Sequence, residues 1–157
     1  MNLELIVQDL YQPSTVDEPT WVNWFQSWLQ TPDLRLPPAA TYELSLRLTT
    51  DLEIQALNAQ FRHQDKSTDV LSFAAMEVDF PEIELESGDL SLYLGDIIIS
   101  VDTAVRQAPE HGYSIRKELA WLASHGLLHL LGWDHPDETS LLIMLNQQET
   151  FLINSGL

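Results

Sequence analysis

The segment from His125 to His135 constrains the fold more than any other part of the sequence. His125 and His129 are four residues apart in an apolar run. Four residues make about one turn of an α-helix, so both imidazoles project from the same helix face. Gly132 then ends the helix, because glycine readily adopts the left-handed conformation that reverses the chain and brings His135 back toward the other two rings. Three neutral nitrogen donors around one point predict a metal site with an open coordination position.

The alternative for a histidine on an apolar helix is a core residue with satisfied ring nitrogens, but two on one face need a shared partner, which a metal ion supplies. The sequence has no cysteine, so the metal must be held by His, Asp or Glu. We expect one Zn²⁺ per chain, with a bound water whose pKa falls toward about 7. Nickel or another divalent ion fits the same ligands. His63 and His111 lack such neighbours and are expected at the surface.

The spacing also matches the zinc-peptidase pattern H-E-x-x-H-x-x-G-x-x-H, with one departure. Gly126 occupies the position of the glutamate that serves as the general base in those enzymes. A glycine costs about 1 kcal/mol relative to alanine inside a helix, so we expect another backbone or the substrate to approach Gly126 closely. Asp134 either orients an imidazole or, as we favour, caps a helix that begins at Pro136.

The remaining sequence predicts an α+β fold, a mixed sheet of about four strands packed against helices, in a single domain of residues 1–157. The order of elements is β-α-β-α-β-β-α-α-α, and the helix that carries the metal motif is central. Strands are expected at 3–10, 42–50, 70–75 and 92–100, and helices at 17–29, 51–63, 101–111, 115–131 and 136–154.

Apolar spacing predicts which faces of these elements are buried. Three sets of residues are expected to face the core: Trp21, Trp24, Phe25, Trp28 and Leu29; then Tyr42, Leu44, Leu46 and Leu48; then Leu52, Ile54, Leu57 and Phe61.

The charge of the chain opposes nucleic-acid binding as a whole. The formal net charge is -17, from 24 acidic and 7 basic residues. Any anion-binding surface must therefore use a few cations, which are otherwise ordinary surface charges: Arg62, Lys66, Arg106, Arg116 and Lys117. Residues 76–91 contain six acidic and no basic side chains and are expected to form an exposed loop. The sequence shows no cleavable leader and no apolar run long enough for a membrane span, so we expect a cytoplasmic protein.

Four stretches resemble one known family. Residues 125–135, His-Gly-Leu-Leu-His-Leu-Leu-Gly-Trp-Asp-His, closely resemble the H-G-x-L-H-L-x-G-y-D-H signature of the YbeY family of bacterial rRNA-processing endoribonucleases. Residues 57–62, 67–73 and 95–100 resemble the family's L-N-x-x-y-R, [P/S]-T-D-V-L-S-F and G-D-I-x-I-s motifs, in the same order. The resemblance covers about residue 42 to the end of the chain.

The resemblance implies a zinc-dependent, single-strand-specific endoribonuclease that acts in 16S rRNA 3′-end maturation and ribosome quality control in the cytoplasm. It implies His125, His129 and His135 as metal ligands, with a catalytic role for His125 as well. It also implies that Arg62 is the family's functional arginine. A guanidinium can hold a phosphate with two hydrogen bonds and offset the charge that develops during phosphodiester cleavage. Lys66 joins Arg62 as an expected substrate-binding residue.

The expected partners are an rRNA precursor and the small ribosomal subunit or a basic ribosomal protein that recruits so acidic a chain; neither DNA nor a membrane is expected. Thr68 and Asp69 are expected beside the metal, where they either contact the substrate or hold the turn. Two alternatives stay open. The first alternative is a ribosome-assembly binding factor with a structural metal. The second is a different metallohydrolase, and Gly126 in the position of the general base argues against it.

Overall fold

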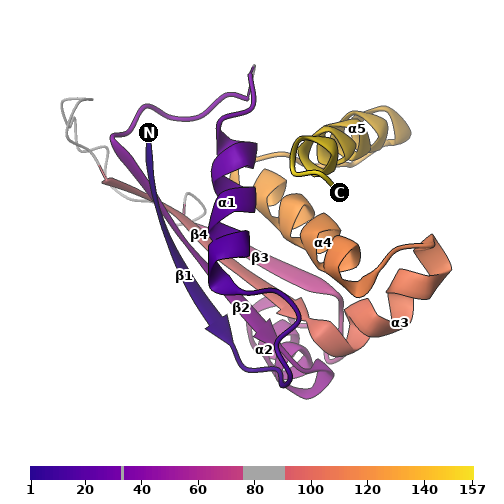
Figure 1. Cartoon of the computed structure of the whole chain (residues 1–157). Helices are drawn as coiled ribbons and strands as arrows, with labels where there is room; N and C mark the ends of the chain where they lie inside the picture. The colour runs from indigo at the N-terminus through magenta and orange to yellow at the C-terminus, as the bar shows by residue number, and fades with distance from the viewer. Residues whose placement is uncertain (33, 76–90) are drawn as a thin grey trace.

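The computed structural model describes residues 1–32, 34–75 and 91–157, and its elements follow one another in the predicted order (Figure 1). The predicted acidic loop, apart from Ser91, lies outside the described residues. The elements are β1 (Asn2–Asp9), α1 (Glu18–Leu29), β2 (Thr41–Thr49), α2 (Asp51–Arg62), β3 (Val70–Ala74), β4 (Ser91–Ser100), α3 (Val101–His111), α4 (Ile115–Leu130) and α5 (Glu138–Asn154).

The four strands form one mixed sheet in the order β1-β2-β4-β3. β1 is parallel to β2 and β2 is parallel to β4, whereas β3 is antiparallel to β4. Side chains alternate across β2 as predicted, and the four expected core residues of this strand are buried: Tyr42, Leu44, Leu46 and Leu48. The prediction of an α+β fold with a mixed sheet of about four strands is therefore confirmed.

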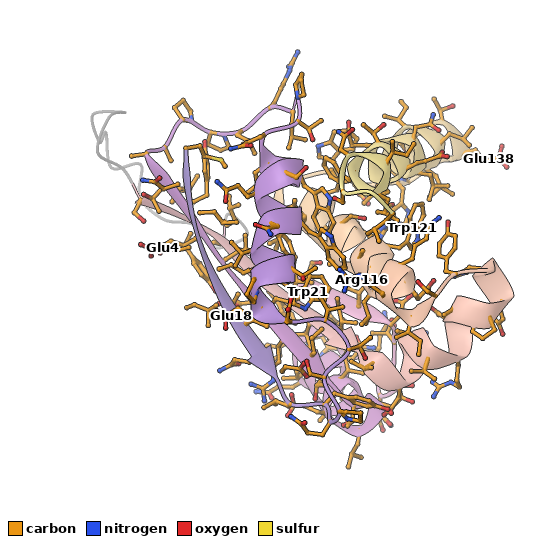
Figure 2. All side chains as sticks on the ribbon, in the orientation of Figure 1. Glu4, Glu18, Trp21, Arg116, Trp121 and Glu138 are labelled. Atoms are coloured by element: carbon orange, nitrogen blue, oxygen red, sulfur yellow. The ribbon has the colours of Figure 1, made fainter. Side chains whose placement is uncertain are left out.

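The helices cover the two faces of the sheet unequally. α1 and α4 pack on one face over the large core, and α5 packs against both of them (Figure 1). Trp28 of α1 ties this layer together, because its Nε1 donates to the carbonyl of Phe151, 3.1 Å away, and to Oγ of Ser155, 2.8 Å away. Figure 2 shows Trp21 on the side of α1 toward α4 and Glu4 on the outer side of β1, away from the helices.

α2 lies on the opposite face, where it covers a smaller cluster formed with Leu71 of β3 and Ile98 of β4. The predicted inward face of α2 is therefore partly wrong. Ile54 is fully buried, but Leu52 is 80% exposed and Phe61 is 54% exposed. α2 packs against the sheet and touches α3, and the rest of its surface faces solvent, so it buries a narrower stripe than its apolar pattern suggests.

A β-bulge in β4 brings β3 and α4 close together. Glu43 pairs with Tyr93 and Leu44 pairs with Gly95, so β4 contains one extra residue at this point. Gly95 has φ +138°, and a Cβ there would lie 2.2 Å from the carbonyl oxygen of Phe73. The absence of a side chain at this position therefore permits the close packing on which the metal motif rests.

Among the described residues, no helix combines the length and the apolar character that a membrane crossing requires.

Candidate metal centre

α4 presents the first two histidines of the motif. The helix begins after Ser114, whose hydroxyl accepts a hydrogen bond from the backbone N–H of Lys117. It is buried around most of its circumference, so it is central as predicted. At its end the N–H of Gly132 donates to the carbonyl of His129, and Gly132 has φ +91°. The left-handed glycine turns the chain back toward the helix, as the sequence predicts.

This turn brings the three predicted histidines together. The centre of the His135 ring lies 5.6 Å from that of His125 and 5.5 Å from that of His129. One ring nitrogen from each of the three residues lies within 4.8 Å of the others. The Nε2 atoms of His125 and His129 face each other at 2.9 Å. Three imidazoles that converge in this way have the geometry and the donor type that a divalent ion such as zinc uses.

Gln148 of α5 determines which nitrogen His125 presents. Its Oε1 lies 3.1 Å from Nδ1 of His125, and its Nε2 donates to the carbonyl of Trp121 at 3.3 Å. The second bond orients the amide so that Oε1 accepts from the imidazole, which leaves Nε2 of His125 free to ligate. Sequence reasoning missed this residue. The available signal is a glutamine spaced to share one helix face with Met144, Phe151 and Leu152, where a buried polar group needs a partner.

The electrostatics of the site favour the ligating form of the histidines. Burial is the main cause that lowers the pKa of both His125 and His129 below the ordinary value. Charge on the neighbouring histidines acts in the same direction. Both imidazoles are therefore neutral at pH 7, and a neutral imidazole is the form that binds a metal.

Arg62 lies on the wall of the same cavity as these histidines. The cavity has a volume of about 650 Å³ and is lined by Arg62, Asp69, His125 and His129, among other residues. Arg62 is the last residue of α2, and its Nη2 donates to the carbonyl of Ser72 at 2.7 Å. Its guanidinium carbon lies 5.0 Å from the centre of the Phe73 ring. These contacts with β3 hold the charge at the cavity.

Two further predicted residues, Lys66 and Asp69, differ in their position relative to this cavity. Lys66 is exposed in the segment between α2 and β3 and does not line this cavity. Asp69 lines the cavity and also holds the turn, because its Oδ1 accepts from the N–H of Val70 at 2.8 Å and from the hydroxyl of Thr68 at 3.4 Å. Both roles left open for Asp69 are therefore compatible with its position.

The close approach predicted at Gly126 exists, but it comes from side chains of the sheet. A Cβ on Gly126 would lie 2.8 Å from Cγ2 of Ile97 and 3.1 Å from Oγ of Ser72. The expectation of an approaching backbone or substrate is therefore wrong. Position 126 faces the sheet, so it could not direct a glutamate into the cavity without displacing β4.

The predicted start of the last helix is wrong. α5 begins at Glu138 and is capped by Asp137, which forms a reciprocal pair of hydrogen bonds with Ser140. Asp134 does not cap it. Oδ1 of Asp134 instead accepts from the backbone N–H of His135 at 2.8 Å, which fixes the segment that carries the third histidine.

Of the two isolated histidines, His63 is exposed and ends α2 with φ 57°, as expected for a surface residue. His111 is also exposed, as expected, but it has a partner. Its Nδ1 lies 2.9 Å from a carboxylate oxygen of Glu118, which is completely buried. This pair joins α3 to α4.

The remaining predicted cations lie away from the metal cavity. Arg116 lies over Trp24 between α1 and α4, with its guanidinium carbon 5.1 Å from the ring centre (Figure 2). Arg106 pairs with Asp51 at 2.9 Å. The ammonium group of Lys117 lies over a tyrosine ring. Of the seven Lys and Arg residues, all of which the structure describes, Arg62 lines the cavity.

Comparisons with known proteins agree with this geometry. A family model described as Endoribonuclease YbeY matches residues 7–156. The "Endoribonuclease YbeY" of Nostoc sp. is 56% identical over 94% of this chain and 79% of its own length. The protein of the same name from Cyanothece sp. is 51% identical over 100% of this chain and 95% of its own length. The solution structure of TM1509 from Thermotoga maritima shares the fold, with a TM-score of 0.61 and 23% identity over 96% of this chain and 88% of that one.

Proposed function

The chain belongs to the YbeY family of endoribonucleases, and we propose that it cleaves single-stranded RNA at the cavity shared by its histidines and Arg62. Endoribonucleases are hydrolases that cleave the phosphodiester bonds of RNA. The observation that carries the proposal is that Arg62 lines the same cavity as His125 and His129, two of the three clustered histidines.

Each group has a distinct task in this proposal. His125, His129 and His135 hold one Zn²⁺, which supplies a polarised water and a Lewis acid when bound. Arg62 binds the scissile phosphate and offsets the charge that grows on its oxygens. His125 also acts in catalysis, by holding the ion with the nitrogen that Gln148 leaves free. Lys66 contacts the RNA outside the cavity.

The biological substrate follows from the family as a further proposal. The protein acts as one domain of residues 1–157 on the 3′ end of 16S rRNA precursors and in ribosome quality control, in the cytoplasm. A net charge of -17 repels a free polyanion, so a basic ribosomal protein or the small ribosomal subunit recruits the enzyme to its substrate. The same charge supports the second candidate, a ribosome-assembly binding factor in which the metal is structural.

Cleavage by the metal-loaded protein tests the leading candidate. We expect wild-type protein to cut a single-stranded 16S precursor fragment, and expect chelation or His129→Ala to abolish the cut. Equal residual RNA cleavage by wild type and His129→Ala would show that this chain is not the nuclease. Rescue of a deletion strain by both His125→Ala and Arg62→Ala, with mature 16S rRNA restored, would favour the binding factor.

A further inference from the structure

Trp133 differs in position from the other four tryptophans. Trp21, Trp24 and Trp28 are buried in α1, and Trp121 of α4 packs edge-on against a tyrosine ring. Trp133 follows the glycine that ends α4, is half-buried, and lines the metal cavity. It is therefore the tryptophan that a ligand in this cavity can reach.

The structure holds Trp133 in place from two sides. Its N–H donates to the carbonyl of Leu128 at 3.0 Å. Part of its side chain packs against the main core. A side chain that is already fixed loses little conformational entropy when a ligand binds, so Trp133 is suited to be a contact surface.

The Trp133 ring keeps a face without a stacking partner inside the described part of the protein. Within the described ranges, no aromatic ring and no cation stacks on it, although many other aromatic side chains have such a partner. A cavity of about 650 Å³ is large enough for a small-molecule ligand, and hence for a nucleobase beside a phosphate.

Charge provides an independent argument. The affinity of most nucleic-acid-binding proteins comes largely from cations that neutralise phosphates. This chain has 7 basic and 24 acidic residues, and of its basic residues Arg62 lines the cavity. Basic side chains therefore supply a single positive charge at the site, and an uncharged contact adds binding that this charge alone does not provide. Stacking of a base on an aromatic ring is such a contact, and it works for every base.

We propose that Trp133 stacks on the nucleobase next to the phosphate held by Arg62, and that this contact makes the enzyme select single-stranded RNA. The inference rests on the proposed nuclease function and adds a substrate-positioning residue to it. A base inside a duplex is already stacked on both faces and paired with the opposite strand, so it reaches Trp133 only after it is extruded. The selection of single strands thus follows from the position of one ring.

The test uses metal-loaded full-length protein and single-stranded RNA with 2-aminopurine placed at successive positions. We expect wild type to change the fluorescence at one position beside the cleavage site. Trp133→Leu should lose this signal and bind RNA about 5- to 150-fold more weakly, the range expected for one base–aromatic stack. Trp133→Phe retains an aromatic ring, so it should retain most of the fluorescence change and most of the RNA affinity. Tyr113→Leu removes a half-buried aromatic outside the cavity and is the matched control.

An abasic substrate gives the second measurement. Removal of the base at that position should raise the KM of wild type but leave the KM of Trp133→Leu unchanged, because that variant has no stack to lose. Metal content and thermal unfolding show whether each variant is folded. Wild-type affinity in Trp133→Leu, an equal abasic penalty in both proteins, or no fluorescence change at any position in wild type would overturn the inference. Binding with the expected signal but without cleavage would instead overturn the nuclease function alone.

Discussion

At the scale of single residues, the state of the histidines is controlled by groups that do not themselves bind the ion. Gln148 fixes the tautomer of His125 through a 3.1 Å contact, and burial keeps His125 and His129 neutral. Arg62 is held by Ser72 and by the face of the Phe73 ring. The cavity is thus ready to receive a cation and a phosphate without rearrangement of these contacts.

Gln148→Leu should weaken metal binding. The variant removes the acceptor for Nδ1 of His125, and loss of such a partner typically costs about 10- to 100-fold in metal affinity. Gln148→Glu keeps an acceptor oxygen beside Nδ1 but loses the donor to the Trp121 carbonyl, so its zinc affinity should lie between those of the leucine variant and wild type. Competition with a zinc chelator measures both affinities. Equal affinities for the leucine variant and wild type would show that the contact does not orient the ligand.

The metal-free protein should lose stability on acidification through these two histidines. Their folded pKa is lowered, so the unfolded chain, with a pKa of about 6.5, binds protons that the folded chain does not. The free energy of unfolding that they contribute therefore falls as the pH decreases below about 6.5. Denaturant unfolding at pH 7.5 and pH 5.5 should show a larger loss for wild type than for the double variant His125→Gln, His129→Gln. Parallel losses would contradict the assignment.

At the scale of elements, the contact between α4 and the sheet places the clustered histidines. The side of α4 at Gly126 lies directly on Ile97 of β4, and the β-bulge at Gly95 lets β3 approach the same helix. β3 in turn carries the contacts that hold Arg62. The distance between the cation and the histidines is therefore set by how closely α4 packs on β3 and β4.

Gly126→Ala should destabilise the protein even though alanine favours a helix. The gain in helix propensity is about 1 kcal/mol, whereas overpacking a rigid core typically costs about 1–3 kcal/mol, so we expect a net loss of up to about 2 kcal/mol. The new Cβ would lie 2.8 Å from Cγ2 of Ile97, a fully buried β-branched side chain that cannot easily move away. In an Ile97→Ala background the same change should be neutral or stabilising. Additive free energies of unfolding in this double-mutant cycle would contradict the account.

Local patterns predicted most of the elements, and the failures concern contacts between elements. The spacing of His125, His129 and His135 with a glycine turn is a local signal, so the cluster could be predicted. The exposure of Phe61 and the approach of Ile97 to Gly126 depend on where α2 and β4 pack. Gln148 reaches His125 from another helix, and the two residues are 23 positions apart in the sequence. No periodicity in the sequence encodes such a pairing.

At the scale of the whole molecule, the balance of charge separates this protein from most that act on nucleic acids. The net charge is -17. Two arginines outside the cavity are engaged with other side chains, Arg106 with Asp51 and Arg116 with Trp24. The molecule therefore concentrates its attraction for phosphate at one cavity. In our proposals, recruitment by a basic partner and stacking at Trp133 compensate for the weak long-range attraction.

RNA binding should consequently depend weakly on salt. If Arg62 and Lys66 are the phosphate contacts, one or two charges are neutralised, and a plot of log K against log salt should have a slope of about -0.7 to -1.4. Fluorescence anisotropy of a labelled single strand over 50–300 mM salt, about the range in which such slopes are measured, gives this value. A slope steeper than about -3 would require several more phosphate contacts than the cavity provides.

The rate of RNA cleavage by Arg62→Ala tests the central claim most directly, namely that Arg62 and the three histidines form one catalytic site. Zinc-loaded Arg62→Ala should bind its metal normally but cut a single-stranded 16S precursor about 10²- to 10³-fold more slowly than wild type, the loss typical of a group that stabilises transition-state charge. Arg116→Ala, a matched exposed arginine outside the cavity, should cut at the wild-type rate. A wild-type rate in Arg62→Ala would contradict the account.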